Sequence, residues 1–248
     1  ARRRHAAPAD DALALLEHGR HLGARYADRS ACSRHAGSRR AKVKLRTRCR
    51  VDESKLRESL GRFLSPVLVD QVVAQRIDLD RGGDELRATI LFADIREFTS
   101  LTEKHAAKDV VKLLNEYFGR MVEIVFELDG ILDKFIGDAF MAVWGPPKSE
   151  PHDATRAILA AQAVLQELEA LNAERQARGE HAIAVGIGIA TGTCVAGAIG
   201  AKRRMEYTVI GDAVNLASRL SGVAGSNEIV CDGETLVGIE PVLPVTSS

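Results

Sequence analysis

Two carboxylates in the middle of the sequence are placed where a cation could bind them. Asp94 follows the apolar run Thr89–Ala93, and Asp138 follows Gly137 between two further apolar runs. Two carboxylates that meet without a basic neighbour repel each other, and a divalent cation removes that repulsion. Oxygen ligands and few histidines favour Mg²⁺ or Mn²⁺ over Zn²⁺. The pair therefore predicts a metal site, and the alternative is an ordinary turn aspartate at each position.

Three further polar side chains lie on elements that are otherwise apolar. Lys134 lies between Leu132 and Ile136, where an ammonium group needs an acceptor; the alternative is a lysine that extends from an edge strand into water. Asn215 and Arg219 are four residues apart, so on a helix they share one face. An amide beside a guanidinium suits an anionic oxygen, and the alternative is an ordinary hydrophilic helix surface.

The hydrophobic pattern predicts the elements that hold these residues. The order β-α-β-β-α-β followed by further β and α indicates an α+β, ferredoxin-like layout, in which helices cover one face of an antiparallel-rich sheet. In this layout we expect the strands of the hairpin at Gly137-Asp138 to flank the first strand, so that both aspartates reach one point. The predicted strands are 89–93, 130–136, 139–144, 183–191, 205–210 and 228–231, the helices are 107–128, 153–178 and 212–221, and 192–200 is a glycine-rich exit.

The first long helix, 107–128, has a clear apolar stripe that is expected to face the core. Its members are Val110, Leu113, Leu114, Phe118, Met121, Val122 and Val125. Before the first strand, Gly82-Gly83-Asp84-Glu85-Leu86 nearly spells the active hairpin of diguanylate cyclases. Because it precedes the first strong strand signal, we interpret it as a connecting turn.

Composition narrows the class of protein. The chain has 248 residues and zero formal net charge, but residues 1–50 hold 14 basic and 4 acidic residues. That segment carries +10, so the remainder carries −10, and a basic arm could contact lipid, nucleic acid or the body itself. Neither a membrane-spanning run nor a signal peptide is evident. Four cysteines without framework spacing make the cytoplasm the expected compartment.

The sequence predicts three segments. Residues 1–50 form a basic, disordered extension rich in Arg, Ser, Ala and Gly. Residues 51–87 form a helical linker, divided at Pro66, which is either a brace or a coupling helix that pairs with its copy in a dimer. Residues 88–248 form the catalytic domain.

Three motifs in order resemble the class III nucleotidyl cyclases of bacterial type. They are L-F-A-D-I-R-E-F-T at 91–99, L-D-K-F-I-G-D-A-F-M-A-V-W-G at 132–145 and Y-T-V-I-G-D-A-V-N-L-A-S-R at 207–219. The resemblance runs from about Leu56 to Cys231. It implies the cyclase version of the ferredoxin-like fold, and three separate motifs in the family's order make the likeness specific.

The resemblance assigns a role to each candidate residue. Asp94 and Asp138 match the metal-binding aspartates, with the Ile95 carbonyl as a further ligand for two Mg²⁺ or Mn²⁺ ions. Lys134 and Thr208 match the pair that recognises the purine. Adenylyl cyclases carry Lys with Asp or Thr at these positions, whereas guanylyl cyclases carry Glu and Cys. A lysine donor suits adenine N1 and a threonine hydroxyl can accept from the N6 amine, while guanine presents the opposite pattern.

The remaining roles concern the ribose and the phosphates. Asn215 matches the residue that orients the ribose, and Arg219 matches the one that stabilises the transition state at the α-phosphate. Phe98 and Thr99 begin a helix whose free backbone N–H groups favour phosphate. In the family, one protomer of a head-to-tail dimer supplies the metal ligands and the other supplies the base, ribose and arginine positions, so a homodimer is expected to have two equivalent sites.

The expected function is that of an adenylyl cyclase, a phosphorus-oxygen lyase that converts ATP to cyclic AMP and pyrophosphate, with no nucleic acid as partner. The alternatives are a guanylyl cyclase and an inactive cyclase-like regulatory module. Two features depart from the family. The lysine that grips the β- and γ-phosphates is replaced by Asn227-Glu228, so Lys202, Arg203 or Arg204 could substitute. The C-terminus looks shortened after Cys231, which could leave the sheet without an edge.

Overall fold

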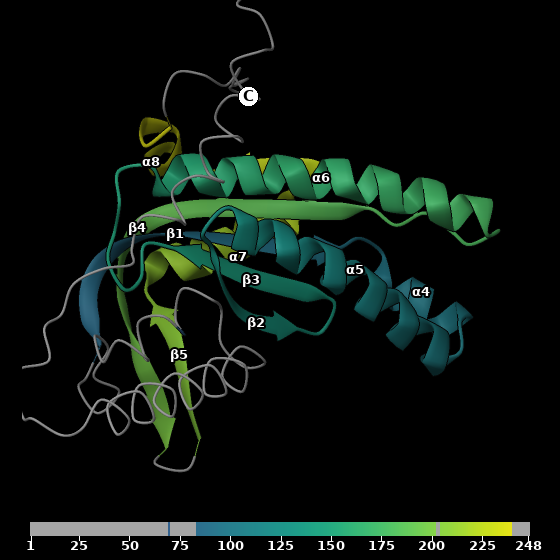
Figure 1. Ribbon diagram of the computed structural model, residues 1–248, viewed down its shortest axis with the longest axis horizontal. Helices are drawn as coiled ribbons and strands as arrows, with labels where there is room; N and C mark the ends of the chain where they lie inside the picture. Colours follow the sequence, from purple (N-terminus) through teal and green to yellow (C-terminus); the bar gives the residue numbers. More distant parts are fainter. Residues whose placement is uncertain (1–68, 70–82, 202–203, 240–248) are drawn as a thin grey trace, which may run out of the picture. The chain divides into compact units, whose positions relative to one another are not determined.

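The computed structural model describes Val69 and residues 83–201 and 204–239. Outside the described residues lie the predicted extension 1–50, the cations Lys202 and Arg203, and residues 240–248. The predicted linker 51–87 also lies outside them, except for Val69 and residues 83–87. The elements, labelled as in Figure 1, are β1 (Asp84–Ile95), α4 (Phe98–Lys104), α5 (Ala107–Glu127), β2 (Ile131–Ile136), β3 (Ala139–Trp144), α6 (Asp153–Ala177), β4 (Val185–Ala201), β5 (Arg204–Ile210), α7 (Asp212–Val223), β6 (Glu228–Cys231) and α8 (Gly233–Val237).

The sheet confirms the predicted α+β, ferredoxin-like layout. Its strands run in the order β2-β3-β1-β4-β5, and β6 pairs with β4. All neighbours are antiparallel except β4 and β6, so the sheet is mixed. β1 lies between β3 and β4. The expectation that both hairpin strands flank β1 is therefore wrong, because β2 forms the edge beyond β3.

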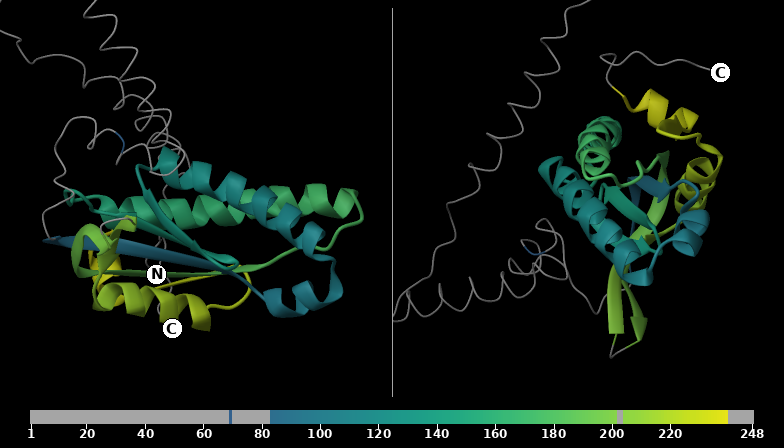
Figure 2. Two further views of the ribbon diagram at one scale, coloured as in Figure 1. Left: turned by 90° about the horizontal axis from the view of Figure 1, so that it is seen from below. Right: turned by 90° about the vertical axis from the view of Figure 1, so that its right-hand side faces the viewer.

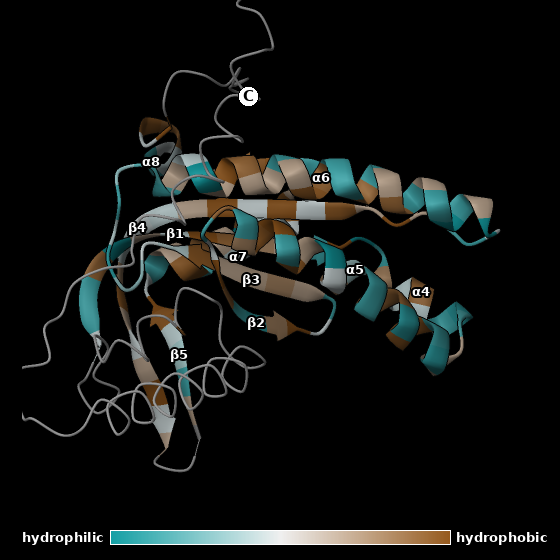
Figure 3. Cartoon of the chain, in the orientation of Figure 1, coloured by the Kyte–Doolittle hydropathy of each residue, from teal (hydrophilic) through white to brown (hydrophobic). Residues whose placement is uncertain are grey.

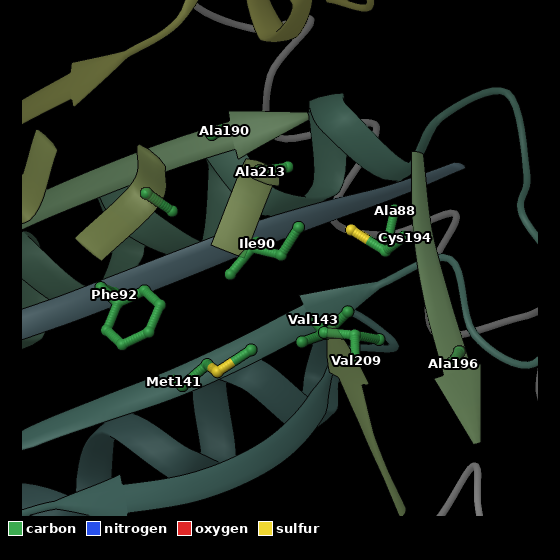
Figure 4. Close-up of a cluster of buried hydrophobic side chains, with 11 residues drawn as sticks. Ala88, Ile90, Phe92, Met141, Val143, Ala190, Cys194, Ala196, Val209 and Ala213 are labelled. Atoms are coloured by element: carbon green, nitrogen blue, oxygen red, sulfur yellow. The ribbon is translucent and has the colours of Figure 1, made fainter. Parts of the chain in front are cut away.

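Helices cover both faces of this sheet, so the expectation that they cover one face is wrong for α7. Helices α5 and α6 lie on one side and α7 on the other (Figure 2). On the α5 side, the ring of Tyr117 lies 6.3 Å from that of Phe140 on β3. On the α7 side, Ile90 of β1 packs in one buried cluster with Ala213 and Ala217 (Figure 4). A sheet that is apolar on both faces needs a layer on each.

Helix α7 lies unusually close to β4 because a glycine faces it. A Cβ atom on Gly188 would lie 2.0 Å from the backbone nitrogen of Ser221 and 2.2 Å from the carbonyl oxygen of Ala217. Only glycine allows the backbone of a helix to approach a strand this closely. The buried residues of α7 are correspondingly small, namely Ala213, Ala217 and Ser221.

Two segments predicted as turn and exit are strand. Asp84 begins β1 and pairs with Ala196, so the interpretation of 82–86 as a connecting turn is wrong for Asp84–Leu86, and the first strand begins before the predicted boundary at 88. The glycine-rich stretch 192–200 is the second half of β4. Local propensity disfavoured a strand in both places, but the two segments pair with each other and β5 extends the pairing. Asp84–Leu86 lie within one strand, and Gly82 is outside the described residues.

The long helices match their predicted ranges within a residue. Along α6, hydrophobic and hydrophilic segments alternate (Figure 3). Helix α5 differs from prediction in its core contact, because Tyr117 is fully buried whereas Phe118 is half-buried. Leu114, Phe118 and Val122 instead line a cavity of about 480 Å³ with Phe135 of β2. None of the helices in the described ranges combines the length and apolar character that a membrane crossing requires.

The C-terminal part of the described chain closes the sheet in an unexpected way. β6 pairs with the first half of β4, and β5 pairs with the second half, so the two strands share the outer edge of β4. A buried chain of hydroxyls then fixes α8 to the sheet. Thr191 Oγ1 lies 2.9 Å from Thr89 Oγ1 and 2.8 Å from Thr235 Oγ1. In the described residues, β5 and β6 thus form the edge of the sheet beyond β4.

Candidate active site

The two aspartates of the predicted metal site meet at one end of the sheet. Asp94 pairs with Ala139, and Asp138 is the residue directly before Ala139 in the tight turn between β2 and β3. Gly137 has a φ of 64°, which allows this two-residue turn. Burial raises the pKa of Asp138, and the neighbouring Asp94 raises it further. The structure therefore brings the two carboxylates within electrostatic reach of each other.

A basic neighbour of this pair was missed from the sequence. Arg96 Nη2 lies 2.8 Å from Asp94 Oδ2, its Nε donates to the Asp94 carbonyl at 3.3 Å, and Nη1 donates to the Ala224 carbonyl at 3.4 Å. The expectation of no basic neighbour is therefore wrong. The guanidinium fits because Gly186 of β4 leaves room: a Cβ there would lie 2.7 Å from Arg96 Cζ. Arg96 partly offsets the charge of Asp94, and it acts against the rise in the pKa of Asp138.

A buried tyrosine beneath the pair was also missed. Tyr117 is fully buried, and its hydroxyl has no hydrogen-bond partner within the described part of the chain. Burial raises the pKa of Tyr117 well above its usual value, and both Asp94 and Asp138 raise it further. This end of the sheet thus has an excess of negative charge. The sequence did contain a signal, because Tyr117 directly precedes Phe118 in the predicted helix. The core position was assigned to Phe118 instead.

The donor set fits a hard divalent cation. In the described ranges, no three His, Cys, Asp or Glu side chains are grouped to hold a metal ion. A pair of carboxylates is nevertheless what Mg²⁺ commonly uses, because it keeps several waters and takes its other ligands from substrate phosphates. Ile95, whose carbonyl is the predicted third ligand, ends β1 with its side chain buried.

The predicted base-recognition pair also comes together. Thr208 of β5 donates a hydrogen bond from Oγ1 to Asp133 Oδ2 at 2.9 Å. Lys134 Nζ lies 3.5 Å from the same Asp133 oxygen and 3.3 Å from Glu206 Oε2. Burial raises the pKa of Asp133 above its usual value, although the Thr208 hydrogen bond and Lys134 act against this rise. Lys134 and Thr208 thus converge on a carboxylate that sequence reasoning missed, although a second charged residue in the apolar run 131–136 was a visible signal.

Asn215 and Arg219 lie four residues apart on α7, so they share one face as predicted, and both are exposed. Neither side chain has a hydrogen bond or ion pair with another residue in the described ranges. Within the described ranges, no hydrogen bond or ion pair joins the Asp94–Asp138 pair to the Lys134–Thr208 pair or to α7. An exposed guanidinium and amide without partners remain available for an anionic ligand.

The phosphate positions are only partly covered by the structure. Helix α4 begins at Phe98, so the predicted helix start at Phe98 and Thr99 is confirmed. Phe98 is half-buried and Thr99 is exposed. Lys202 and Arg203 lie outside the described residues, and of Arg204 only the backbone is described, as the first residue of β5. Asn227, at the position of the missing lysine, accepts from the Val185 N–H through its side chain at 3.1 Å.

Comparison with known proteins identifies the family. The model of the adenylate and guanylate cyclase catalytic domain matches residues 84–240. The chain belongs to this family, the class III nucleotidyl cyclases. Adenylate cyclase 1 of Rhizobium meliloti is 38% identical over 170 residues, which is 65% of this chain and 26% of that protein. An uncharacterised protein of Mycobacterium tuberculosis is 36% identical over 189 residues, 75% of this chain and 33% of that protein. The chain thus spans about a quarter to a third of the length of these relatives.

Solved structures with the same fold include cyclases of both nucleotide specificities. The guanylyl cyclase Cya2 is 35% identical with a TM-score of 0.65, covering 67% of this chain and 85% of that chain. The adenylyl cyclase CyaB from P. aeruginosa is 36% identical with a TM-score of 0.63, covering 65% of this chain and 84% of that chain. The chain is therefore a nucleotidyl cyclase catalytic domain, and the choice of base must be argued from its own residues.

Proposed function

We propose that this domain is an adenylyl cyclase that converts ATP to 3′,5′-cyclic AMP and pyrophosphate. The observation that carries the proposal is the convergence of Lys134 and Thr208 at the carboxylate of Asp133. A lysine donates to adenine N1, and a threonine oxygen accepts from the N6 amine. Guanine presents N1–H and O6 instead, so it would face a donor with a donor and an acceptor with an acceptor.

In the proposed reaction the ribose 3′-OH attacks the α-phosphorus, its proton is lost, and the bond to pyrophosphate breaks. Divalent cations bound by Asp94, Asp138 and the Ile95 carbonyl would lower the pKa of the hydroxyl and neutralise the triphosphate. Arg219 donates to the α-phosphoryl oxygens, where negative charge builds, and Asn215 orients the ribose. The backbone N–H groups at the start of α4 bind phosphate.

The same proposal requires two copies of the chain, arranged head to tail. Two cavities of the described part, of about 310 Å³ and about 480 Å³, include none of the proposed site residues. The elements that hold those residues also expose large apolar side chains, which a second copy of the chain would cover. These are Ile136 of β2, Met205 and Ile210 of β5, and Leu216 and Val223 of α7.

Mixing two inactive variants tests the shared site. Asp94→Ala lacks a metal ligand and Arg219→Ala lacks the arginine, so each homodimer is expected to be inactive. After mixing, half of the dimers would be mixed, and each mixed dimer has one complete site. About a quarter of the wild-type specific activity should return. If the mixture stays inactive while exchange of chains is verified, the site lies within one chain and the head-to-tail proposal is wrong.

Purified protein with Mn²⁺ and either ATP or GTP tests the choice of base. Cyclic AMP as the main product supports the proposal, cyclic GMP would indicate a guanylyl cyclase, and no cyclic product would indicate a regulatory module. The double variant Lys134→Glu with Thr208→Cys should then shift preference toward GTP. Unchanged preference for ATP in that variant would refute the roles proposed for Lys134 and Thr208.

A further inference from the structure

Asp133 is a nearly inaccessible carboxylate that touches both members of the proposed base-recognition pair. Its side chain is 2% exposed, Thr208 Oγ1 donates to its Oδ2 at 2.9 Å, and Lys134 Nζ lies 3.5 Å from that oxygen. A charged side chain buried on an edge strand is costly unless hydrogen bonds and a cation compensate. Here both compensating groups are residues proposed to recognise the base.

An irregularity in β2 explains how Asp133 and Lys134 reach the same neighbours. Leu132 pairs with Ala142 and Lys134 pairs with Met141, so Asp133 is an extra residue in the pairing of β2 with β3. Successive residues of a regular strand point to opposite faces, whereas a bulge re-aims side chains and is frequent beside active sites. At this bulge, Asp133 contacts Thr208 and Lys134 contacts Glu206, both on β5.

The direction of the Thr208 hydrogen bond decides what the hydroxyl can offer a base. An ionised carboxylate only accepts hydrogen bonds, so the single hydrogen of the Thr208 hydroxyl is used by Asp133. The lone pairs of Oγ1 are left, and they can only accept. An acceptor at this place matches the N6 amine of adenine and opposes the O6 of guanine.

We propose that Asp133 is a positioning residue for base selection: it holds the Thr208 hydroxyl as an acceptor and thereby sets the preference for adenine over guanine. The inference rests on the proposed adenylyl cyclase activity and deepens it. Thr208 by itself, with a rotatable hydroxyl, could donate to guanine as readily as it accepts from adenine.

Asp133→Asn tests this role with little change in shape. The asparagine NH₂ can donate to Thr208 Oγ1, which frees the hydroxyl hydrogen to donate to a 6-oxo group. The ratio of kcat/KM for ATP to kcat/KM for GTP should fall about tenfold, because one hydrogen bond gained or lost at the base changes the relative rate by roughly this factor. A general loss of folding lowers both values and leaves the ratio unchanged. Asp129→Asn is the matched control and should keep the wild-type ratio. The Asp129 side chain is 69% exposed, and its Oδ2 lies 3.9 Å from Arg156 Nη1.

A double-mutant cycle separates action through Thr208 from action through Lys134. As a single variant, Thr208→Val removes the hydroxyl and should lower the ratio of kcat/KM for ATP to kcat/KM for GTP. Thr208→Ser retains the hydroxyl and should keep the wild-type ratio. In the Thr208→Val background, Asp133→Asn should cause no further change in the ratio. A further change as large as in the wild type would show that Asp133 acts through Lys134, and would overturn the inference. The two Thr208 variants test the idea even if Asp133→Asn does not fold.

The outcomes distinguish this inference from the function on which it rests. A wild-type protein that prefers GTP refutes the adenylyl cyclase proposal, and the inference fails with it. A wild-type protein that prefers ATP, with the same ratio in Asp133→Asn, overturns the inference alone.

Discussion

Replacing Gly188 of β4 by alanine should displace α7 and disable the site that this helix helps to form. The new Cβ would lie 2.0 Å from the Ser221 backbone nitrogen, whereas ordinary contacts begin at 3.4 Å, so α7 must move by about 1.4 Å. The clash is with helix backbone, so no side-chain rotation relieves it. Overpacking of this kind costs about 1–3 kcal/mol. For a domain of this size that corresponds to a fall in Tm of roughly 2–12 °C.

The effect on turnover should exceed the effect on stability. Asn215 and Arg219 move with α7, and a misplacement of about 1 Å in a group that positions substrate can cost about 100-fold in rate. Thermal unfolding and cyclic nucleotide formation with Mn²⁺ would be measured on the same preparation. Gly222→Ala, on the same helix, is the control, because apart from its chain neighbours and the backbone of its own helix no described atom lies within 4 Å of the added Cβ. That variant should be as stable as the wild type or more stable by up to about 1 kcal/mol.

A Gly188→Ala protein with wild-type Tm and turnover would refute this reasoning. It would mean that α7 does not lie against β4 at the described distance, or that its position does not matter for the reaction. An equal loss in Gly222→Ala would also contradict it, since the helix would then be sensitive to any added methyl group.

Three further variants test the charges and hydroxyls around the site. The raised folded-state pKa of Asp138 means that its ionised form destabilises the fold, and that stability present below the ordinary value of 3.8 is lost as pH rises through the folded value. In EDTA, Asp138→Asn should therefore raise Tm at pH 7 but not near pH 3. If variant and wild type have the same Tm at pH 7, the raised pKa of Asp138 is contradicted. Tyr117→Phe should not lower the free energy of unfolding in urea, because the hydroxyl has no partner in the described part of the chain; a loss above about 1 kcal/mol would reveal one. Thr235→Val should cost about 1 kcal/mol in the same assay, since it breaks the 2.8 Å bond to Thr191, and no loss would show that this bond does not stabilise α8.

The predictions from sequence succeeded where the signal was local. The helix at Ala107–Glu127 and the hairpin at Gly137-Asp138 were expected from periodicity and from the turn, and both are observed. Asp94 and Asp138 were expected to meet, and they do. The reason for their meeting was partly wrong, because β3 alone brings Asp138 beside β1.

Residues whose role depends on a distant partner were missed. Arg96 was given no role from the sequence, and it reaches Asp94 because Gly186, ninety positions away, leaves space for its guanidinium. Asp133 was likewise given no role from the sequence, and the bulge in β2 brings it to Thr208. Both contacts join segments far apart in the chain, and a single sequence does not encode such pairings in any local pattern.

By itself the sequence determined the order of strands and helices, the family and the chemical types available at the site, since hydrophobic period, turn residues and motif spacing are local properties. Only the tertiary structure decided which face α7 covers, how closely it approaches Gly188 and which groups surround Lys134 and Thr208. These depend on the register between β4 and its neighbours and on one extra residue in β2. Register is set by the packing of the whole sheet, because a shift of one residue moves every side chain to the opposite face.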